Sequence, residues 1–438
     1  MTLFAHEPAR EVPIIAEPDV LVIGGGAAGI AAAIAASRQG ANVMLVERWG
    51  FLGGTLTAVT LGGLCGGWAM APDELIPVVG GIYAEFIARL EKLGGILPPK
   101  RWSQVACLPY DPTRVKFVAD EMTGGCVNVH FHTWMADVAT TDGRVHTVFL
   151  ENKGGRFAVR PKMVVDASGD GDIAAHAGAP FKLGSGGITQ FGSSMFRMAN
   201  VDTDVFDKLS RDDIAKCFED LVADGLDLPR TAVALYKHPI PGVVHFNATR
   251  VARPDGSPFD LTNPKEISAA EREGRRQALL YESAARKNLP GFAKAMIVDI
   301  GPQIGIRETR LIQGDAVLTE DDVLNCTKPT DAIACASWPV EVHAEGLKTV
   351  WKFLPASDYY KISYGCLLPA GLENVLMAGR CISATHEAQA SARVSAPSFA
   401  LGEAAGIAAA MSLQVGDRSR AISITELQSK LQAQGAII

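Results

Sequence analysis

Four short runs of mainly apolar residues stand far apart in this chain, each next to glycine, proline or charged residues. They are Val20–Ile23, Asn42–Val46, Met163–Asp166 and Asn374–Ala378. A run of this length and composition predicts a strand that is buried on both faces, as in a parallel sheet. Because three runs come early and one comes late, we expect both ends of the chain to contribute to one sheet.

Helical spacing of apolar residues predicts an amphipathic helix at Ile82–Leu93, and further helices are expected at Thr113–Met122 and Lys265–Lys287. A further helix, which is rich in small residues, is expected at Ala31–Ser37. Another is expected to begin near Pro397, since proline suits the first turn of a helix.

Period-two alternation marks a different kind of segment. Val127–Thr133 alternates apolar residues with Asn128, His130 and His132, and we interpret these histidines as a polar strand face because no third metal ligand is near. The runs 145–150 and 157–160 flank an Asn-Lys-Gly-Gly turn, which predicts a small antiparallel meander.

Together these patterns predict an α/β protein. A Rossmann-like dinucleotide-binding domain with a parallel sheet and a small antiparallel meander is expected in two parts, 1–180 and 351–438. Between them, glycine clusters become rarer and polar helices and longer loops take over. Residues 181–350 are therefore predicted to form an inserted α+β substrate or cap domain.

The first apolar run leads directly into a glycine turn. Gly24, Gly26 and Gly29 occupy the fixed places of G-x-G-x-x-G, in which the first permits the turn, the second lets a pyrophosphate approach and the third lets helix and strand pack closely. Glu47 ends the second run, eighteen residues after Gly29, where an acid accepts the ribose hydroxyls. We therefore expect a dinucleotide without a 2′-phosphate.

Composition narrows the class of protein. The 438 residues are 48% hydrophobic and 20% charged, with a net charge of -7, which is typical of a folded protein and disfavours nucleic acid or an anionic membrane as a partner. We find no apolar run that we expect to span a bilayer. The first 18 residues lack a basic segment followed by an apolar one, so a cytoplasmic location without a signal peptide is expected.

None of the eight cysteines forms a C-x-x-C pair. This spacing argues against a thioredoxin-like redox pair, an iron–sulfur cluster or a zinc site, and we predict no metal. Most of the cysteines are expected to be buried or inert thiols. Cys65 and Cys366 are weak candidates for a role, because both lie in glycine-containing loops near expected cofactor segments.

The chain resembles the FAD-dependent oxidoreductases of the two-dinucleotide-binding-fold flavoproteins. The matching stretches are VLVIGGGAAGIAAAIAA, FLGGTLT, MVVDASGDGDIAAHAGAP, IGIRETRLIQGDAVLTEDDV and YGCLLPAGLENVLMAGRCISATHEAQASARV, followed by LGEAAG. The resemblance implies a noncovalent FAD. The residues that it implies for binding are Gly24, Gly25, Gly26, Ala27, Ala28, Gly29, Glu47, Arg48, Gly53, Gly54, Thr55, Met135, Ala167, Ser168, Gly169, Gly379, Arg380, Ser398 and Phe399.

The helix near Pro397 has a further role in this scheme. The N–H groups of Ser398 and Phe399 are expected to be free at its positive end, where they would hold negative charge on the pyrimidine edge of a reduced flavin.

The reaction itself leaves several alternatives open. The chain has one complete nucleotide-binding turn, because Gly184–Gly187 is interpreted as a loop, so a pyridine-nucleotide disulfide reductase is not expected. The leading hypothesis is a dehydrogenase or oxidase that moves a hydride between a small organic molecule and flavin N5. A flavin monooxygenase and a flavin-carrying electron-transfer subunit are the alternatives. The substrate, the electron acceptor or donor, and a homo-oligomeric state stay open.

Three residues are the candidates for catalysis. The segment 381–396 is expected to be a loop that passes the flavin ring, and it carries His386 and Arg393. It is distantly similar to the His-Gly-Ala-Asn-Arg segment of the fumarate reductase and L-aspartate oxidase group, although the spacing here is longer. Arg307 is the third candidate. It or Arg310 is expected either to reach an anionic group or to pair with Glu308 or the acidic run 320–322.

Overall fold

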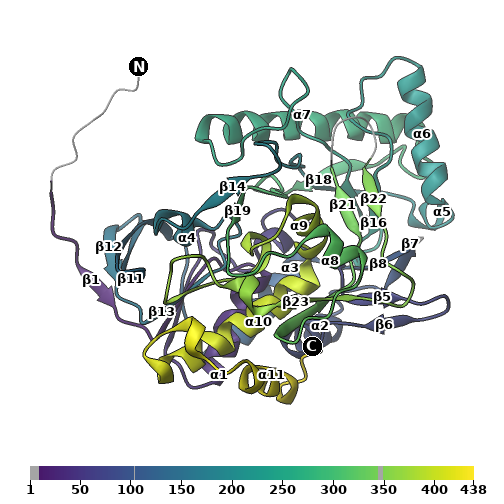
Figure 1. The fold of residues 1–438 in the computed structure, drawn as a ribbon. Helices are drawn as coiled ribbons and strands as arrows, with labels where there is room; N and C mark the ends of the chain where they lie inside the picture. The colour runs from purple at the N-terminus through teal and green to yellow at the C-terminus, as the bar shows by residue number, and fades with distance from the viewer. Residues whose placement is uncertain (1–8, 103, 344–348) are drawn as a thin grey trace.

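The computed structural model describes residues 9–102, 104–343 and 349–438. The larger lobe occupies the lower part of Figure 1. At its centre lies a five-stranded parallel sheet in the order β24, β13, β2, β3, β9. Its strands are β2 (Val20–Ile23), β3 (Val43–Val46), β9 (Asn128–His130), β13 (Met163–Asp166) and β24 (Val375–Met377). All four apolar runs are thus confirmed as neighbouring parallel strands, and the alternating segment adds β9 at the edge.

Two small-residue helices cover this sheet and touch backbone to backbone. They are α1 (Ala27–Arg38) and α10 (Ser395–Ser412). A side chain at Gly402 would place its Cβ 2.1 Å from the carbonyl oxygen of Ala28, and one at Gly406 would lie 2.2 Å from that of Ala32. The glycines of α10 therefore fix how closely the two helices pack. The predicted helices α2 (Gly81–Lys92) and α3 (Pro112–Thr123) pack beside them, with α11 (Ile424–Ala433) near the C-terminus.

Helix α10 also corrects the expectation that no run could span a bilayer. The segment 395–415 is long and apolar enough by length and composition, but 83% of its apolar window is buried inside the protein. It is the core helix of this fold. The expected absence of a signal peptide concerns residues 1–18, of which 1–8 lie outside the described residues.

The predicted meander is present and larger than expected. It consists of β10 (Trp134–Thr141), β11 (Arg144–Asn152) and β12 (Gly155–Val159), with β1 (Ile14–Ala16) added in parallel to β12. Strand β10 was not among the predicted elements. It brings Trp134 and Met135 back to the edge of the parallel sheet, where they face the end of β3.

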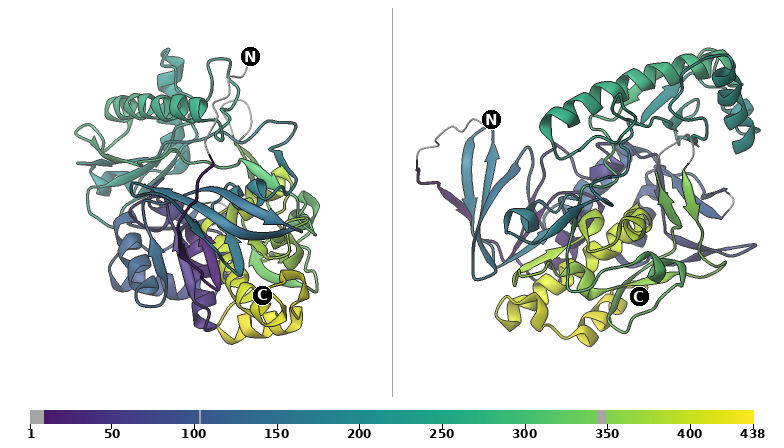
Figure 2. Two further views of the ribbon diagram at one scale, coloured as in Figure 1. Left: turned by 90° about the vertical axis from the view of Figure 1, so that its left-hand side faces the viewer. Right: turned by 45° about the horizontal axis from the view of Figure 1, so that its top comes forward.

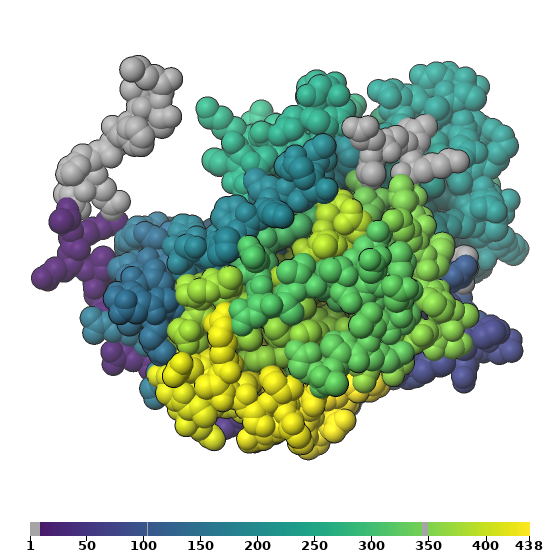
Figure 3. Space-filling model, in the orientation of Figure 1, coloured from purple at the N-terminus to yellow at the C-terminus, as the bar shows by residue number. Residues whose placement is uncertain are grey.

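A smaller lobe with its own core sits over the larger one (Figures 2 and 3). Its antiparallel sheet has the order β16, β17, β15, β18, and the long helix α7 (Pro264–Asn288) packs beside it. Phe196, Phe246 and Phe292 are fully buried in its core. The other bounds are β15 (Phe196–Ala199), α5 (Thr203–Phe206), α6 (Arg211–Ala223), β16 (Ala234–Lys237), β17 (Val244–Asn247) and β18 (Met296–Ile300).

Short strand pairs and helices make up the rest of the chain. They are β4 (Gly63–Cys65), β5 (Trp68–Met70), β6 (Leu75–Pro77), β7 (Lys100–Trp102), β8 (Val105–Pro109), α4 (Asp172–His176), β14 (Phe181–Leu183), β19 (Arg310–Ile312), α8 (Glu320–Leu324), β20 (Ala332–Ala336), β21 (Val340–Val342), β22 (Val350–Lys352), β23 (Tyr360–Ser363) and α9 (His386–Ala392). Several residues between Leu318 and Val340 belong to the core of the larger lobe, whereas the separate core of the smaller lobe lies within 196–295. The predicted boundaries at 180 and 350 stay predictions.

Candidate active site: two adjoining cavities

One cavity lies at the carboxyl ends of the parallel strands, beside the glycine turn, and we call it the turn cavity. Its volume is about 170 Å³. This is where ligands bind in open parallel sheets. The sequence-predicted residues that line it are Gly24, Gly26, Ala27, Ala28, Glu47, Arg48, Gly54, Thr55, Met135, Ala167, Ser168, Gly169, Gly379, Arg380 and Ser398. Gly25, Gly29, Gly53 and Phe399 lie outside its lining.

The three glycines of the turn have the separate roles that the motif predicts. Gly24 has φ +95°, and its Cβ would lie 2.5 Å from the carbonyl oxygen of Ala167. A Cβ on Gly29 would lie 1.8 Å from the carbonyl oxygen of Gly24, so this glycine serves packing. A Cβ on Gly26 would meet nothing nearer than the Cα of Gly54 at 3.7 Å. Gly26 therefore leaves open space on the cavity side.

The start of α1 presents free backbone donors to that space. Gly26 caps the helix without a side-chain hydrogen bond, and the first intrahelical bond runs from the N–H of Ile30 to its carbonyl. The preceding N–H groups, which include those of Ala27 and Ala28, have no helical partner. An anionic pyrophosphate suits this position, because the donors and the helix dipole both favour negative charge.

Glu47 is held firmly at the end of β3. Its carboxylate accepts the N–H of Gly25 at 2.7 Å and the N–H of Trp49 at 2.9 Å. Burial raises the pKa of Glu47, while these hydrogen bonds oppose that rise. The carboxylate thus lines the cavity in a fixed orientation, and Gly25 contributes by positioning it.

The same end of the cavity contains residues that the sequence did not reveal. The Arg48 guanidinium lies 5.4 Å from the centre of the Trp134 ring and donates to Gln303 Oε1 at 2.7 Å. Trp49 Nε1 donates to the same oxygen at 3.0 Å. Gln303 comes from the segment after the smaller lobe, so sequence distance concealed it.

The opposite end is built around an ion pair. Arg380 Nη2 lies 2.8 Å from Asp170 Oδ1, and a Cβ at Gly169 would lie 2.9 Å from that guanidinium. Arg310 pairs with Asp172 at 2.7 Å. The expected partners of Arg310, Glu308 or the acidic run 320–322, are therefore wrong, because strand β19 places it beside α4.

The first turn of α10 also differs from expectation. The helix begins at Ser395, and the N–H of Ser398 donates to the carbonyl of Val394 at 3.2 Å, so it is not free. The free N–H groups at this end are those of Ser395 and Ala396. Phe399 packs in the core against Phe86, with ring centres 4.9 Å apart.

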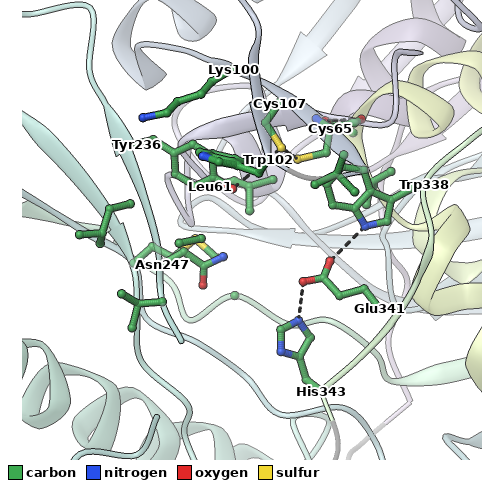
Figure 4. Close-up of a pocket in the computed structure, with 18 of the residues that line it drawn as sticks. Leu61, Cys65, Lys100, Trp102, Cys107, Tyr236, Asn247, Trp338, Glu341 and His343 are labelled. Carbon is green, nitrogen blue, oxygen red and sulfur yellow. Dashed lines mark hydrogen bonds and ion pairs between the residues drawn. The ribbon is translucent and has the colours of Figure 1, made fainter. Parts of the chain in front are cut away.

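A second cavity of about 360 Å³ lies between the lobes, and we call it the interlobe cavity. It shares Thr55, Val59, Ile306, Arg380 and Arg393 with the turn cavity, so the two adjoin. Its walls contain the aromatic residues Trp102, Tyr236 and Trp338 (Figure 4), and also Trp351. Such walls suit an organic ring or chain.

Glu341 and His343 give this cavity a charged centre that the sequence did not indicate. Glu341 accepts from Trp338 Nε1 at 3.0 Å and lies 3.2 Å from His343 Nε2 (Figure 4). Burial alone would raise the pKa of Glu341, but His343, Arg393 and Arg307 lower it to about 2. Burial and the charge of Arg307 lower the pKa of His343 to about 3. At neutral pH the pair is a carboxylate and a neutral imidazole.

Arg307 and Arg393 both line the interlobe cavity. Arg307 donates through Nη1 to the carbonyl of Phe191 and to Ser193 Oγ, each at 2.7 Å. Arg393 Nη2 makes long bonds of 3.3 Å to Gln190 Oε1 and to the carbonyl of Glu341, and its buried Nε has no partner among the described residues. Burial lowers the pKa of both arginines, most strongly that of Arg307. Two poorly solvated cations of this kind favour an anionic ligand.

His386 lies elsewhere. The expected loop 381–396 is wrong, because the segment contains helix α9, whose first residue is His386. Its Nδ1 lies 2.8 Å from an oxygen of the fully buried Glu308, and His386 lines neither cavity. Burial alone would lower the pKa of His386, but the hydrogen bond and charge of Glu308 raise it. The geometry thus makes His386 one half of an ion pair behind the site.

Comparison with known proteins agrees with this architecture. A family model described as FAD dependent oxidoreductase matches residues 19–431. A curated relative, 4-oxocyclohex-2-ene-1-carboxylate 5-dehydrogenase of Sinomonas cyclohexanicum, is 43% identical over 63 residues, which span 14% of this chain and 10% of the relative.

Two solved structures are similar over most of this chain. A geranylgeranyl bacteriochlorophyll reductase-like protein from Thermoplasma acidophilum is 14% identical, with 96% of this chain and 85% of that one covered and a TM-score of 0.46. The p-nitrophenol 4-monooxygenase of Pseudomonas putida is 13% identical, with 95% and 83% covered and a TM-score of 0.47.

Proposed function

Because this chain belongs to the family of FAD-dependent oxidoreductases, we propose that it is a dehydrogenase or oxidase, which moves a hydride from a small anionic molecule to flavin N5. The main observation that supports this proposal is that the turn cavity and the interlobe cavity adjoin. The open space at Gly26 and the free N–H groups of α1 fit a dinucleotide in the turn cavity. A ligand in the interlobe cavity would then contact the inner end of that dinucleotide.

The lining of the interlobe cavity supports a particular substrate class. Arg307 and Arg393 supply positive charge, and tryptophan and tyrosine side chains supply flat apolar surface. A guanidinium binds a carboxylate with strong, directed hydrogen bonds. The proposed substrate is therefore a cyclic or aromatic carboxylate. A ring that carries a carboxylate also appears in the name of the dehydrogenase relative, although that match is short.

Glu341 and His343 are the proposed proton-accepting pair. The imidazole is neutral at neutral pH, and Glu341 lies within hydrogen-bond distance of its Nε2. A carboxylate in this position orients an imidazole and stabilises the imidazolium that forms. When an anionic substrate offsets the charges of Arg307 and Arg393, the pKa of His343 is expected to rise, which makes it a better base in the complex.

Rapid anaerobic mixing tests this function. The holoprotein is mixed with a panel of cyclic and aromatic carboxylates while the flavin absorbance is recorded, without any nicotinamide. Bleaching by a member of the panel supports the proposal. Reduction only by NADH or NADPH, followed by an oxygen-dependent C4a-peroxide, would assign a monooxygenase. Reduction only by a protein donor would assign an electron-transfer subunit. The expected cytoplasmic location, and the expected absence of nucleic-acid and membrane partners, stay predictions.

A further inference from the structure

Two cysteines that are 42 residues apart in the sequence meet in the wall of the interlobe cavity. The sulfurs of Cys65 and Cys107 are 2.9 Å apart, and Figure 4 shows them side by side. Cys65 lies at the end of β4 and Cys107 lies directly opposite on the antiparallel strand β8. Among the described residues, no other two cysteine sulfurs lie within hydrogen-bond distance.

The register of these strands places the two side chains at a favourable type of position. The N–H of Tyr110 donates to the carbonyl of Gly62, which marks that pair as hydrogen-bonded. Since pair types alternate along an antiparallel ladder, Cys65 and Cys107 form a non-hydrogen-bonded pair, whose Cα atoms lie about 4.5 Å apart. The N–H of Cys65 instead donates to Ser395 Oγ at 2.8 Å. This separation falls within the range that a disulfide bridges without backbone movement.

Access to the pair is limited to small reagents. Cys65 is 7% exposed and Cys107 is 1% exposed, and both line the interlobe cavity. The side chains of Trp102, Tyr236 and Trp338 pack around them. A protein thiol cannot reach sulfurs at this depth, whereas a small peroxide that enters the cavity can.

We propose that Cys65 and Cys107 are a reversible redox site in the cavity wall, oxidised to a cross-strand disulfide by a small peroxide. In this step one thiol sulfur attacks a peroxide oxygen, the O–O bond breaks, and a sulfenic acid and one water form. The second thiol then displaces the hydroxyl as a second water, and the S–S bond closes. Two thiols and one hydrogen peroxide thus give one disulfide and two waters.

The surroundings of the pair set its pH dependence. The hydrogen bond to Cys107 and burial together raise the pKa of Cys65. The other titratable or charged side chains near the pair are Tyr83, Tyr110, Tyr236, Glu341 and Arg393, together with Lys100, which is opposite Cys107 on β7. Because the thiolate is the attacking form, the rate of oxidation is expected to increase as the pH is raised.

The test uses the FAD-loaded protein and counts thiols rather than turnover. Reduced protein is treated with hydrogen peroxide, alkylated under denaturing conditions, digested and analysed by mass spectrometry. We expect a disulfide-linked peptide pair that contains Cys65 and Cys107, a fall from eight free thiols to six, and full recovery with dithiothreitol. Cys366→Ser should form the same linked pair, with a fall from seven free thiols to five, whereas Cys107→Ser should yield no linked pair.

Two outcomes would overturn the proposal. In one, Cys65 and Cys107 both stay alkylatable after prolonged exposure at alkaline pH while the exposed Cys126 oxidises. In the other, either cysteine accumulates as sulfinic acid without a linked peptide. The wild-type protein alone decides between these results, so the proposal remains testable even if a serine variant folds poorly.

Discussion

The turn cavity and the interlobe cavity adjoin, yet they are built in different ways. The turn cavity lies at the ends of the parallel strands, where the backbone of the glycine turn forms one wall and Gly26 leaves open space on the cavity side. The interlobe cavity is formed by side chains from both lobes, among them Tyr236 from the smaller lobe and Cys107 from the larger one. The first contains mainly elements that a sequence encodes locally, and the second depends on tertiary packing.

This difference matters for how each cavity responds to mutation. A site made of backbone is sensitive to added atoms, since a new side chain fills the space meant for the ligand. A site made of side chains is sensitive to removed groups, since charge and hydrogen bonds are lost. The predictions below use this contrast, in order of decreasing expected effect.

The largest effect is expected from Gly26→Val. The Cβ has room in the protein itself, at 3.7 Å from the Cα of Gly54, but the branched side chain would enter the turn cavity. We expect the purified variant to be nearly free of FAD, measured as the ratio of flavin absorbance to protein absorbance. Gly26→Ala should show an intermediate loss.

The matched control is the melting temperature of the two proteins without FAD. Gly26→Val apoprotein should melt within a few degrees of wild-type apoprotein, because the added Cβ meets no protein atom nearer than 3.7 Å. Full FAD occupancy in Gly26→Val would contradict the placement of the pyrophosphate at this turn.

A smaller effect, on stability, is expected for Glu403, which lies in α10 and faces the start of α2. One carboxylate oxygen accepts the N–H of Ile82 at 3.0 Å, the other has no partner among the described residues, and burial raises the pKa of Glu403 to about 7. Because the pKa of this carboxyl group is higher in the folded state than in the unfolded state, ionisation destabilises the fold. The protein therefore loses stability as the pH rises from the unfolded-state pKa of about 4.5 through the folded-state pKa of about 7. At pH 8 the cost is on the order of 3 kcal/mol.

Glu403→Gln should therefore raise the free energy of unfolding at pH 8 and have little effect at pH 4.5, as measured by urea denaturation at both values. Glu91 is exposed, so Glu91→Gln serves as a control. It should leave the free energy of unfolding unchanged at both pH values. If Glu403→Gln stabilises the protein equally at both pH values, the ionisation of Glu403 is not the cause of the stability change.

A still smaller effect is expected from His386→Gln. The ion pair with Glu308 raises the pKa of His386, so its stabilisation is present below pH 6.5 and is lost as pH rises through the higher folded-state value. We expect a loss of about 2 kcal/mol at pH 6 and less at pH 9, in line with a hydrogen bond to a charged group. Flavin content and the rate of flavin reduction should be unchanged. A large drop in that rate with normal stability would restore His386 as a catalytic residue.

The parts of the molecule that could be predicted from sequence are those whose cause is local. The apolar runs, the glycine turn and Glu47 at the end of β3 all depend on neighbours in the chain, and the structure has each of them. Helix α9 was missed although a signal existed. Thr385 caps it by accepting the N–H of Ala388, and an alanine-rich segment follows.

The interlobe cavity gave no comparable local signal. Arg307 and Arg393, which lower the pKa values of Glu341 and His343, lie more than thirty positions away in the sequence, and Cys65 meets Cys107 only because β4 pairs with β8. Spacing rules such as C-x-x-C detect ligands on one turn or loop, so they miss a pair across a sheet. Such sites become visible only once the lobes are placed against each other.

The central claim is that the turn cavity binds FAD and the interlobe cavity binds the substrate. One pair of variants tests this claim most directly. Arg48 lines only the turn cavity and Arg307 only the interlobe cavity, so Arg48→Met and Arg307→Met form a matched pair. For each variant, FAD release on dilution is measured by fluorescence, and the affinity for benzoate is measured from the change that it causes in the flavin absorbance.

We expect Arg48→Met to weaken FAD binding by about tenfold and leave the benzoate affinity of the loaded protein unchanged. Arg307→Met should retain FAD and bind benzoate at least about tenfold more weakly, as expected for the loss of a charged hydrogen bond. If Arg307→Met instead releases FAD and binds benzoate normally, the interlobe cavity is not the substrate site, and the central claim fails.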